Sequence, residues 1–463
     1  MAVATTTSSW SDFLAEGRAA RMALICLGLW LNAADSLVTT TIMPTIGRQL
    51  GGYALFSWAT AAYGVGAILS GATAAGLSAR VGLRRVMVVA GLLTAVGCAV
   101  SALAPDMIVL VAGRWVQGLG AGWIVGACYA AVGAMFPARH LARIFGVMTG
   151  VWGVATVLGP LVGAVFAEQD HWRAMFWVFG AQCLAFIIAA VWLLPRDAPA
   201  SGHRTPWGQL GLVLLGVGLL GAADLVTHVW TAAGLCLASV AIFIAAVRLP
   251  GRGEGGLFPR AAGNLSTAIG AAYLSYFAMT AAATGFSVYG PALLQKLFGF
   301  SPLQAGYAAG MESVGWSVAA LAVAGRGERW HGPMIRLGAL CIVGSLAVLA
   351  VTMRAGPVAV ILAAATVLGA GFGLSSGFTG RRVIAAAEGP EREVASAGIN
   401  GVRQVGGAAG ACLAGIIANL LGMSAGVTTA AAQASAVWLF ALAVPVAILG
   451  ALGAWRVAEA RFA

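Results

Sequence analysis

Six ionisable side chains occur inside long apolar stretches of this sequence. They are Asp35, Arg114, Asp224, His228, Glu312 and Arg403. A charged group at the centre of a lipid bilayer costs roughly 2.5–3.5 kcal/mol on insertion scales, so such residues are candidates for function. Carboxyl and guanidinium groups at that depth can bind a proton or a charged solute reversibly.

Asp35 and Glu312 lie near the middle of their apolar stretches and are the best candidates for proton or cation binding. A carboxyl group held away from bulk water can take up and release protons near neutral pH. Each also has a structural interpretation. Asp35 could be permanently paired with an arginine that holds helices together, and Glu312 could make a hydrogen bond between helices.

Two basic residues are each close in sequence to a glutamine. Gln117 follows Arg114 by three positions, which places both on one helix face, and Arg403 directly precedes Gln404. A structural ion pair with Asp35 is one interpretation of Arg114. For Arg403, a structural or gating role and a coupling role are both open.

Asp224 and His228 are four residues apart near the end of another apolar stretch. We expect them to form a solvated helix end.

The composition indicates that lipid is the solvent of most of the chain. Of 463 residues, 60% are hydrophobic and 9% are charged, with a mean hydropathy of +0.92. Soluble domains have about 25% charged residues, and a membrane-spanning helix needs about 20 apolar ones. Fourteen such stretches occur, near residues 22–43, 53–75, 86–104, 107–136, 144–167, 174–194, 208–227, 229–248, 263–295, 302–324, 333–353, 357–379, 394–422 and 432–455.

The basic residues between these stretches predict the orientation in the membrane. With the N-terminus inside, the cytoplasmic segments contain Arg18, Arg21, Arg80, Arg84, Arg85, Arg139, Arg143, Arg196, Arg204, Arg248, Arg252, Arg260, Arg326, Arg329, Arg336, Arg381, Arg382, Arg392, Arg456 and Arg461. The outer segments contain only Arg48, Arg173, Lys296 and Arg354. Positive charge favours the cytoplasmic side, so we expect both termini to be cytoplasmic in a multi-pass protein of the inner (plasma) membrane. The same distribution explains the net charge of +11 without a nucleic-acid partner.

The sequence predicts neither a metal site nor enzyme chemistry. The seven cysteines all fall in apolar stretches, and none forms a Cys-x-x-Cys pair. We find no phosphate-binding glycine loop with lysine and no nucleophile triad, so we expect no cofactor and no ATP-driven mechanism.

Several motifs resemble the Major Facilitator Superfamily, in particular its fourteen-helix drug:proton antiporter branch. The first stretch contains an Asp35-to-Pro44 signature, the fourth contains Arg114-Trp-Val-Gln-Gly, and the thirteenth contains Asn400-Gly-Val-Arg-Gln. The segment from Trp58 to Arg85 resembles the signature gating loop, with Arg80, Gly82, Arg84 and Arg85, although Ala79 replaces its usual aspartate. Gly153, Gly159, Pro160 and Gly163 resemble the antiporter motif.

This resemblance implies an all-helical fold of two six-helix bundles plus an inserted helix pair. The expected division is a cytoplasmic segment at 1–21, a bundle at 22–194, a linker with two helices at 195–262 and a bundle at 263–463. It also implies that Arg114 tunes proton exchange and that the kink at Pro160 forms a flexible seam of an exporter, although a packing kink explains the same residues.

The resulting hypothesis is a monomeric, proton-coupled exporter of hydrophobic or amphipathic compounds in the lipid bilayer. Its coupling residues would be Asp35, Glu312, Arg114, Gln117 and Arg403. The alternatives are a carrier of one endogenous metabolite or lipid, in either direction, and a non-transporting membrane receptor, because a fold does not fix a function.

Overall fold

The computed structural model describes residues 18–137, 140–195, 206–249, 256–389 and 391–460. These residues form fourteen long helices. They are α2 (Arg18–Leu50), α3 (Trp58–Val81), α4 (Leu83–Ala102), α5 (Met107–Met135), α6 (Leu141–Glu168), α7 (Trp172–Leu193), α8 (Trp207–Asp224), α9 (Val229–Arg248), α10 (Ala268–Phe298), α11 (Pro302–Val323), α12 (His331–Thr352), α13 (Val358–Ala386), α14 (Glu391–Leu420) and α15 (Thr429–Glu459).

Each predicted stretch overlaps one of these helices, which confirms the expected fold class. Among the described residues, thirteen helices are long and apolar enough to cross a membrane. The fourteenth, α11, contains Gln304 and Glu312 among its apolar residues. Its start is set by a capping box in which the Ser301 hydroxyl accepts from the Gln304 backbone N–H and the Gln304 side chain accepts from the Ser301 N–H.

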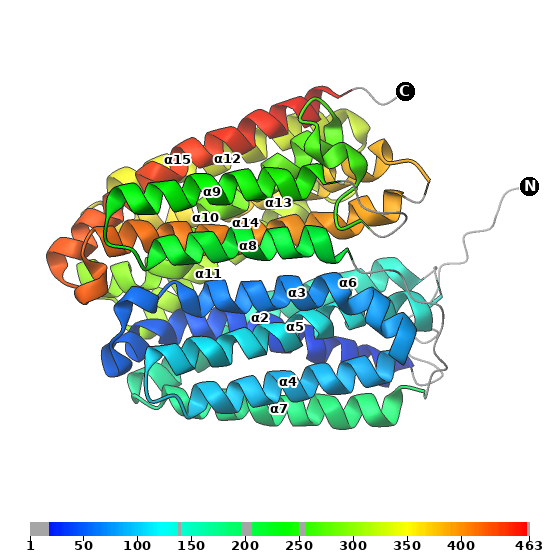
Figure 1. The fold of residues 1–463 in the computed structure, drawn as a ribbon, viewed down its shortest axis with the longest axis horizontal. Coiled ribbons are helices and arrows are strands. Elements are labelled where there is room, and N and C mark those ends of the chain that lie inside the picture. Colours follow the sequence, from blue (N-terminus) through cyan, green and yellow to red (C-terminus); the bar gives the residue numbers. More distant parts are fainter. Residues whose placement is uncertain (1–17, 138–139, 196–205, 250–255, 390, 461–463) are drawn as a thin grey trace, which may run out of the picture.

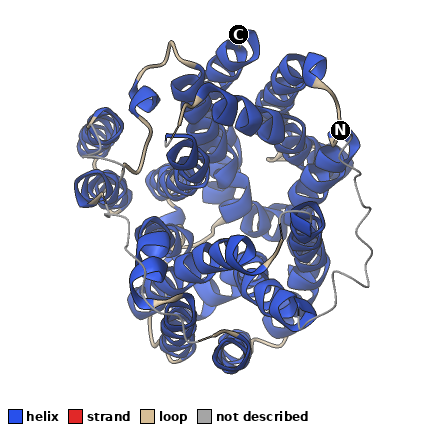
Figure 2. Ribbon diagram, turned by 90° about the vertical axis from the view of Figure 1, so that its right-hand side faces the viewer, coloured by secondary structure: helices blue, strands red, loops and turns tan. Residues whose placement is uncertain are grey.

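The helices pack into two bundles (Figure 1). In the first, α5 packs against α3 and α4, α2 packs against α6, and α4 packs against α7. In the second, α10 packs against α14 and α15, and α13 packs against α11 and α12. Figure 2, viewed nearly along the helix axes, shows the helices end-on in an upper and a lower group.

The inserted pair, α8 and α9, lies outside both bundles. The two helices pack against each other, and α8 also contacts α14 of the second bundle and α3 of the first. Figure 1 shows α8 in front of the boundary between the bundles. The pair is therefore placed where it can touch both halves.

Contacts between the bundles gather at one end of the molecule. We call it the Leu50 end, because α2 ends there, and the opposite one the Arg18 end. At the Leu50 end the Asn419 side-chain amide donates to the Ala54 carbonyl at 2.9 Å, and the rings of Phe56 and Tyr289 stack at 5.2 Å. This end is closed by direct packing of the two halves.

Part of the predicted organisation lies outside the described residues. This applies to residues 1–17 of the expected N-terminal segment and to residues 196–205 and 250–255 of the expected linker. It also applies to Arg139, Arg196, Arg204, Arg252 and Arg461.

Candidate functional site

The structure brings Asp35 and Arg114 together in a buried ion pair inside the first bundle. Arg114 Nη1 lies 2.8 Å from Asp35 Oδ1 and 2.7 Å from Oδ2. Asp35 is 6% exposed and Arg114 is 2% exposed. The structural ion pair considered from the sequence is thus present, joining the middle of α2 to α5.

Further contacts hold the guanidinium group of Arg114 in place. Its Nη1 also donates to Gln117 Oε1 at 2.5 Å, and its Nε donates to the Ala59 carbonyl at 3.2 Å. The Tyr63 ring lies 4.5 Å from the guanidinium carbon, within cation–π range. Arg114 therefore keeps several hydrogen-bond partners even when Asp35 is neutral, although its charge then has no negative counterpart.

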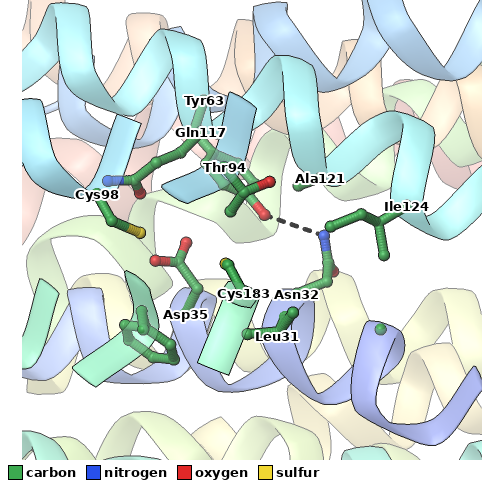
Figure 3. A pocket seen from close by; sticks show the side chains of 12 residues that line it. Leu31, Asn32, Asp35, Tyr63, Thr94, Cys98, Gln117, Ala121, Ile124 and Cys183 are labelled. Atoms are coloured by element: carbon green, nitrogen blue, oxygen red, sulfur yellow. Dashed lines mark hydrogen bonds between the residues drawn. The ribbon is translucent and has the colours of Figure 1, made fainter. Parts of the chain in front are cut away.

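A small internal cavity adjoins this pair (Figure 3). Asp35 points into it, and Tyr63, Thr94, Cys98 and Gln117 line it. The Asn32 amide donates to the Tyr63 hydroxyl at 3.0 Å across one side. The remaining lining residues are Gly28, Leu31, Asn32, Ala121, Ile124, Phe179 and Cys183. The carboxylate thus borders a partly polar space within the first bundle.

Glu312 lies in the second bundle in a different setting. Its Oε2 accepts a hydrogen bond from the Ser287 hydroxyl of α10 at 3.0 Å. Within the part of the chain that the structure describes, no basic side chain lies within ion-pair distance of it. The backbone beneath it is fixed, because a side chain at Gly369 of α13 would strike the Glu312 carbonyl. The structure therefore shows an interhelical hydrogen bond but no compensating positive charge.

Arg403 stacks on an aromatic pair instead of a carboxylate. Its guanidinium carbon lies 4.6 Å from the Trp316 ring, which itself stacks on Phe372 at 5.1 Å. Arg403 also lies within electrostatic range of Tyr276 of α10 and, more weakly, of Tyr129 of α5 in the first bundle. Arg403 of α14 thus lies between the two bundles, with no ion pair to any described acidic residue.

The residues of the antiporter motif lie at the contact between α6, α2 and α11. A Cβ atom on Gly159 would lie 2.9 Å from Leu37 Cβ, and one on Gly163 would lie 3.0 Å from Thr41 Cβ. Pro160 packs against Gly306 of α11. Gly153, by contrast, has open space beside it. Pro160 thus lies in the seam between the bundles, whereas Gly159 and Gly163 pack against α2 within the first bundle.

The signature loop joins α3 to α4 at the Arg18 end. Gly82 adopts a φ of 90°, a conformation that glycine tolerates, and it separates the two helices. Arg80 and Arg85 are exposed and Arg84 is half-buried. Among the described residues, none of the three has an ion pair, in keeping with Ala79 at the usual aspartate position.

The expectation for Asp224 is wrong, whereas His228 is exposed as expected. Asp224 is 2% exposed at the end of α8. Its Oδ2 accepts from the Ser57 hydroxyl at 2.5 Å, and its Oδ1 accepts from the Asn419 amide at 2.9 Å. Tertiary packing against two other helices, invisible in the local sequence, removes it from solvent.

The sequence model of the Major Facilitator Superfamily matches residues 25–411, most of the chain and most of both bundles. The chain belongs to the Major Facilitator Superfamily. This confirms the family expected from the motifs and a transporter rather than an enzyme.

One relative of this superfamily member matches it over nearly its whole length, and two solved structures share its fold. A probable multidrug-efflux transporter of Mycobacterium tuberculosis (strain ATCC 25618 / H37Rv) is 30% identical over 438 residues, which are 90% of this chain and 91% of the relative. Among solved structures, a mutant of the nucleoside transporter NupG has a TM-score of 0.69 at 10% identity, covering 95% of this chain and 99% of its own. A D-xylose-proton symporter has a TM-score of 0.67 at 16% identity, covering 95% and 98%.

Several residues that contact the charged side chains were not predicted from the sequence of this superfamily member. Tyr63, Asn32 and Ser287 contact the coupling candidates or their neighbours, and Ser57 and Asn419 contact Asp224. All are neutral, so no charge at membrane depth marked them. Only their helix positions relative to the charged residues could have indicated them.

The seam offers a direct test of bundle packing. A Cβ atom on Gly306 would lie 2.7 Å from Thr41 Oγ1 and 2.9 Å from Pro160 Cβ. We expect Gly306→Val to force the bundles apart at the Leu50 end and to lower transport turnover at least about fivefold, since overpacking costs roughly 1–3 kcal/mol. Gly344→Val is the control, because Gly344 has open space beside it. Equal turnover in both variants would contradict the assigned seam.

Proposed function

We propose that this transporter exports hydrophobic or amphipathic compounds in exchange for protons, by alternating access. The observation that supports it best is the contrast between two intramembrane carboxyl groups. Asp35 of the first bundle is ion-paired, whereas Glu312 of the second has no positive partner among the described residues. Two carboxyls in unlike settings can be occupied by different cations at different stages of a cycle.

The moving bodies in this proposal are the two bundles, at 22–194 and 263–463, with the linker at 195–262 between them. The arginine-rich Arg18 end faces the cytoplasm of the inner (plasma) membrane, so both termini are cytoplasmic. The closed Leu50 end then makes the described conformation one that is sealed from the outside. Exchange requires that end to open while the Arg18 end closes.

Proton binding at Asp35 supplies the coupling step. A proton on the Asp35 carboxyl cancels its attraction for Arg114, whose remaining partners Gln117, Ala59 and Tyr63 can keep it in place. The change in charge between α2 and α5 alters the packing of the first bundle. Arg114 and Gln117 therefore act as positioning residues for the Asp35 carboxyl.

Substrate binding is assigned to the second bundle. Glu312 offers a negative charge to a cationic compound, and the stacked Trp316 and Phe372 rings offer a flat apolar surface. Arg403 covers the Trp316 ring. A compound with a flat ring system could take the place of its guanidinium group there.

Two observations support export as the direction of transport and hydrophobic or amphipathic compounds as the substrate class. Pro160 of the antiporter motif lies in the seam, and the Mycobacterium tuberculosis relative is named a probable multidrug-efflux transporter. A protein acting alone, as a monomer, suffices for this mechanism because both carboxyls lie within one chain.

The test is uptake of a lipophilic cationic dye into inverted membrane vesicles energised with an acidic interior. We expect dye uptake above that of vesicles lacking the protein, and its collapse when a protonophore removes the pH gradient. A broad compound panel without any gradient-dependent uptake would contradict multidrug antiport and favour a carrier of one endogenous metabolite or lipid.

A further inference from the structure

The inserted helix pair touches both bundles through one buried carboxylate, that of Asp224. Its Oδ2 accepts from the hydroxyl of Ser57, at the start of α3 in the first bundle, at 2.5 Å. Its Oδ1 accepts from the side-chain amide of Asn419, near the end of α14 in the second bundle, at 2.9 Å. Three separate parts of the fold thus meet at one side chain.

The site around Asp224 is built for close approach. Gly415 of α14 has no room for a side chain, because a Cβ atom there would strike both the Ser57 hydroxyl and the Asp224 carboxylate. Gly221 of α8 likewise leaves space for the Trp58 ring of α3. Ser57 is fully buried. The carboxylate is therefore held by polar partners in a tightly packed setting, where each hydrogen bond to a charge is strong.

The pair itself is fastened to the second bundle at the other end. The Phe243 ring of α9 packs edge-on against Phe277 of α10 at 5.7 Å. Helix α8 also packs against α14 of the second bundle. Within the inserted segment, Gln209 of α8 donates to the Leu249 carbonyl at 2.8 Å and accepts from the Leu257 backbone N–H at 2.6 Å, which ties α8 to the chain that leads from α9 into α10. The α8–α9 pair is therefore expected to move with the second bundle, so the bond from Ser57 to Asp224 crosses the moving boundary.

We propose that Asp224 is a latch by which the inserted helix pair holds the Leu50 end of the transporter closed. Opening that end must separate Ser57 from Asp224, and the Asn419 amide from the Ala54 carbonyl. Asp224 is thus a positioning residue for transport, and the added helices control which side is open. This inference rests on the alternating-access part of the proposed function, but not on proton coupling or on any particular substrate.

The test measures opening of the Leu50 end directly. Thr41 of α2 is 1% exposed and lies against Gly306 and Gly163 at that end, so Thr41→Cys adds a thiol that is shielded while the end is closed. Purified protein in nanodiscs is treated with a charged maleimide, and the parent chain without Thr41→Cys gives the background from the native cysteines. The readout is the labelling rate, which needs neither substrate nor a pH gradient.

Added to Thr41→Cys, Ser57→Ala and Asp224→Asn are each expected to raise the labelling rate, on the order of tenfold for Ser57→Ala, because each weakens a hydrogen bond to a charged group. The labelling rate of the double variant should exceed that of the faster single variant only slightly, since both substitutions act through the same hydrogen bond. Ser239→Ala is the matched control. It removes a buried hydrogen bond of 2.7 Å to the Gly216 carbonyl within the inserted pair and should leave the rate unchanged.

Two results would overturn the latch. One is an unchanged labelling rate in both Ser57→Ala and Asp224→Asn. The other is an equal rise in Ser239→Ala, which would mean general loosening of the inserted pair. Thermal unfolding of each variant, followed in parallel, ensures that the compared proteins are folded. If the latch exists without proton antiport, Ser57→Ala and Asp224→Asn will change the labelling rate while the substrate drives no proton movement. The latch and the proposed antiport can therefore fail separately.

Discussion

Asp35→Asn is expected to lower substrate-driven proton movement at least about tenfold, to near the level of liposomes without protein. The amide keeps the size of the side chain but cannot exchange a proton near neutral pH. It also leaves Arg114 without its negative partner, and breaking a buried ion pair costs about 3–5 kcal/mol. Proton movement is measured with an entrapped pH dye in proteoliposomes, and stability is measured by thermal unfolding.

A matched double variant separates these two effects. Asp35→Asn with Arg114→Gln removes both charges, so it should regain most of the lost stability but none of the coupled proton movement. If the double variant moved protons like the wild type, Asp35 and Arg114 would be a structural pair and proton binding would have to be assigned elsewhere.

Glu312→Gln is expected to raise the KM for a lipophilic cation at least about tenfold. The KM for a neutral compound should stay within about twofold of the wild-type value. The reason is that Glu312 has no positive partner among the described residues, so a bound cation can supply one. The glutamine keeps an oxygen for the Ser287 hydroxyl, so the helix contact persists. Transport of the two compounds into inverted vesicles gives the comparison.

Ser287→Ala serves as the control for that hydrogen bond. It keeps the negative charge and removes only the donor, so we expect a much smaller change in KM for the cation. An equal rise in KM for the cationic and the neutral compound in Glu312→Gln would instead mean that this residue supports the packing of α10 and α11.

Most of the fold followed from the sequence, because a membrane-spanning helix must satisfy its backbone polar groups internally and present about 20 apolar residues. The helix ends were harder to predict. Helix α2 runs over Arg18–Leu50, beyond the predicted stretch at 22–43, because its polar ends continue the helix outside the apolar region. The presence of α11 was also predictable, although Glu312 interrupts its apolar character.

The candidate site was only partly predictable. Arg114 and Asp35 could be suggested as partners because both are charges at membrane depth, and the structure pairs them at 2.7 Å. Asp224 was misjudged because its position near the end of an apolar stretch is typical of a solvated residue. Its partners Ser57 and Asn419 lie 167 and 195 positions away, and only tertiary packing brings them to it.

The most direct measurement is proton movement evoked by substrate in proteoliposomes containing the purified wild-type protein. With a pH gradient imposed and a dye inside, adding a lipophilic cation should drive protons in the direction opposite to the compound. We expect a signal that depends on compound concentration and is lost in Asp35→Asn. Compound movement with no accompanying proton movement in the wild type would contradict antiport, and with it the central role given to the Asp35 carboxyl.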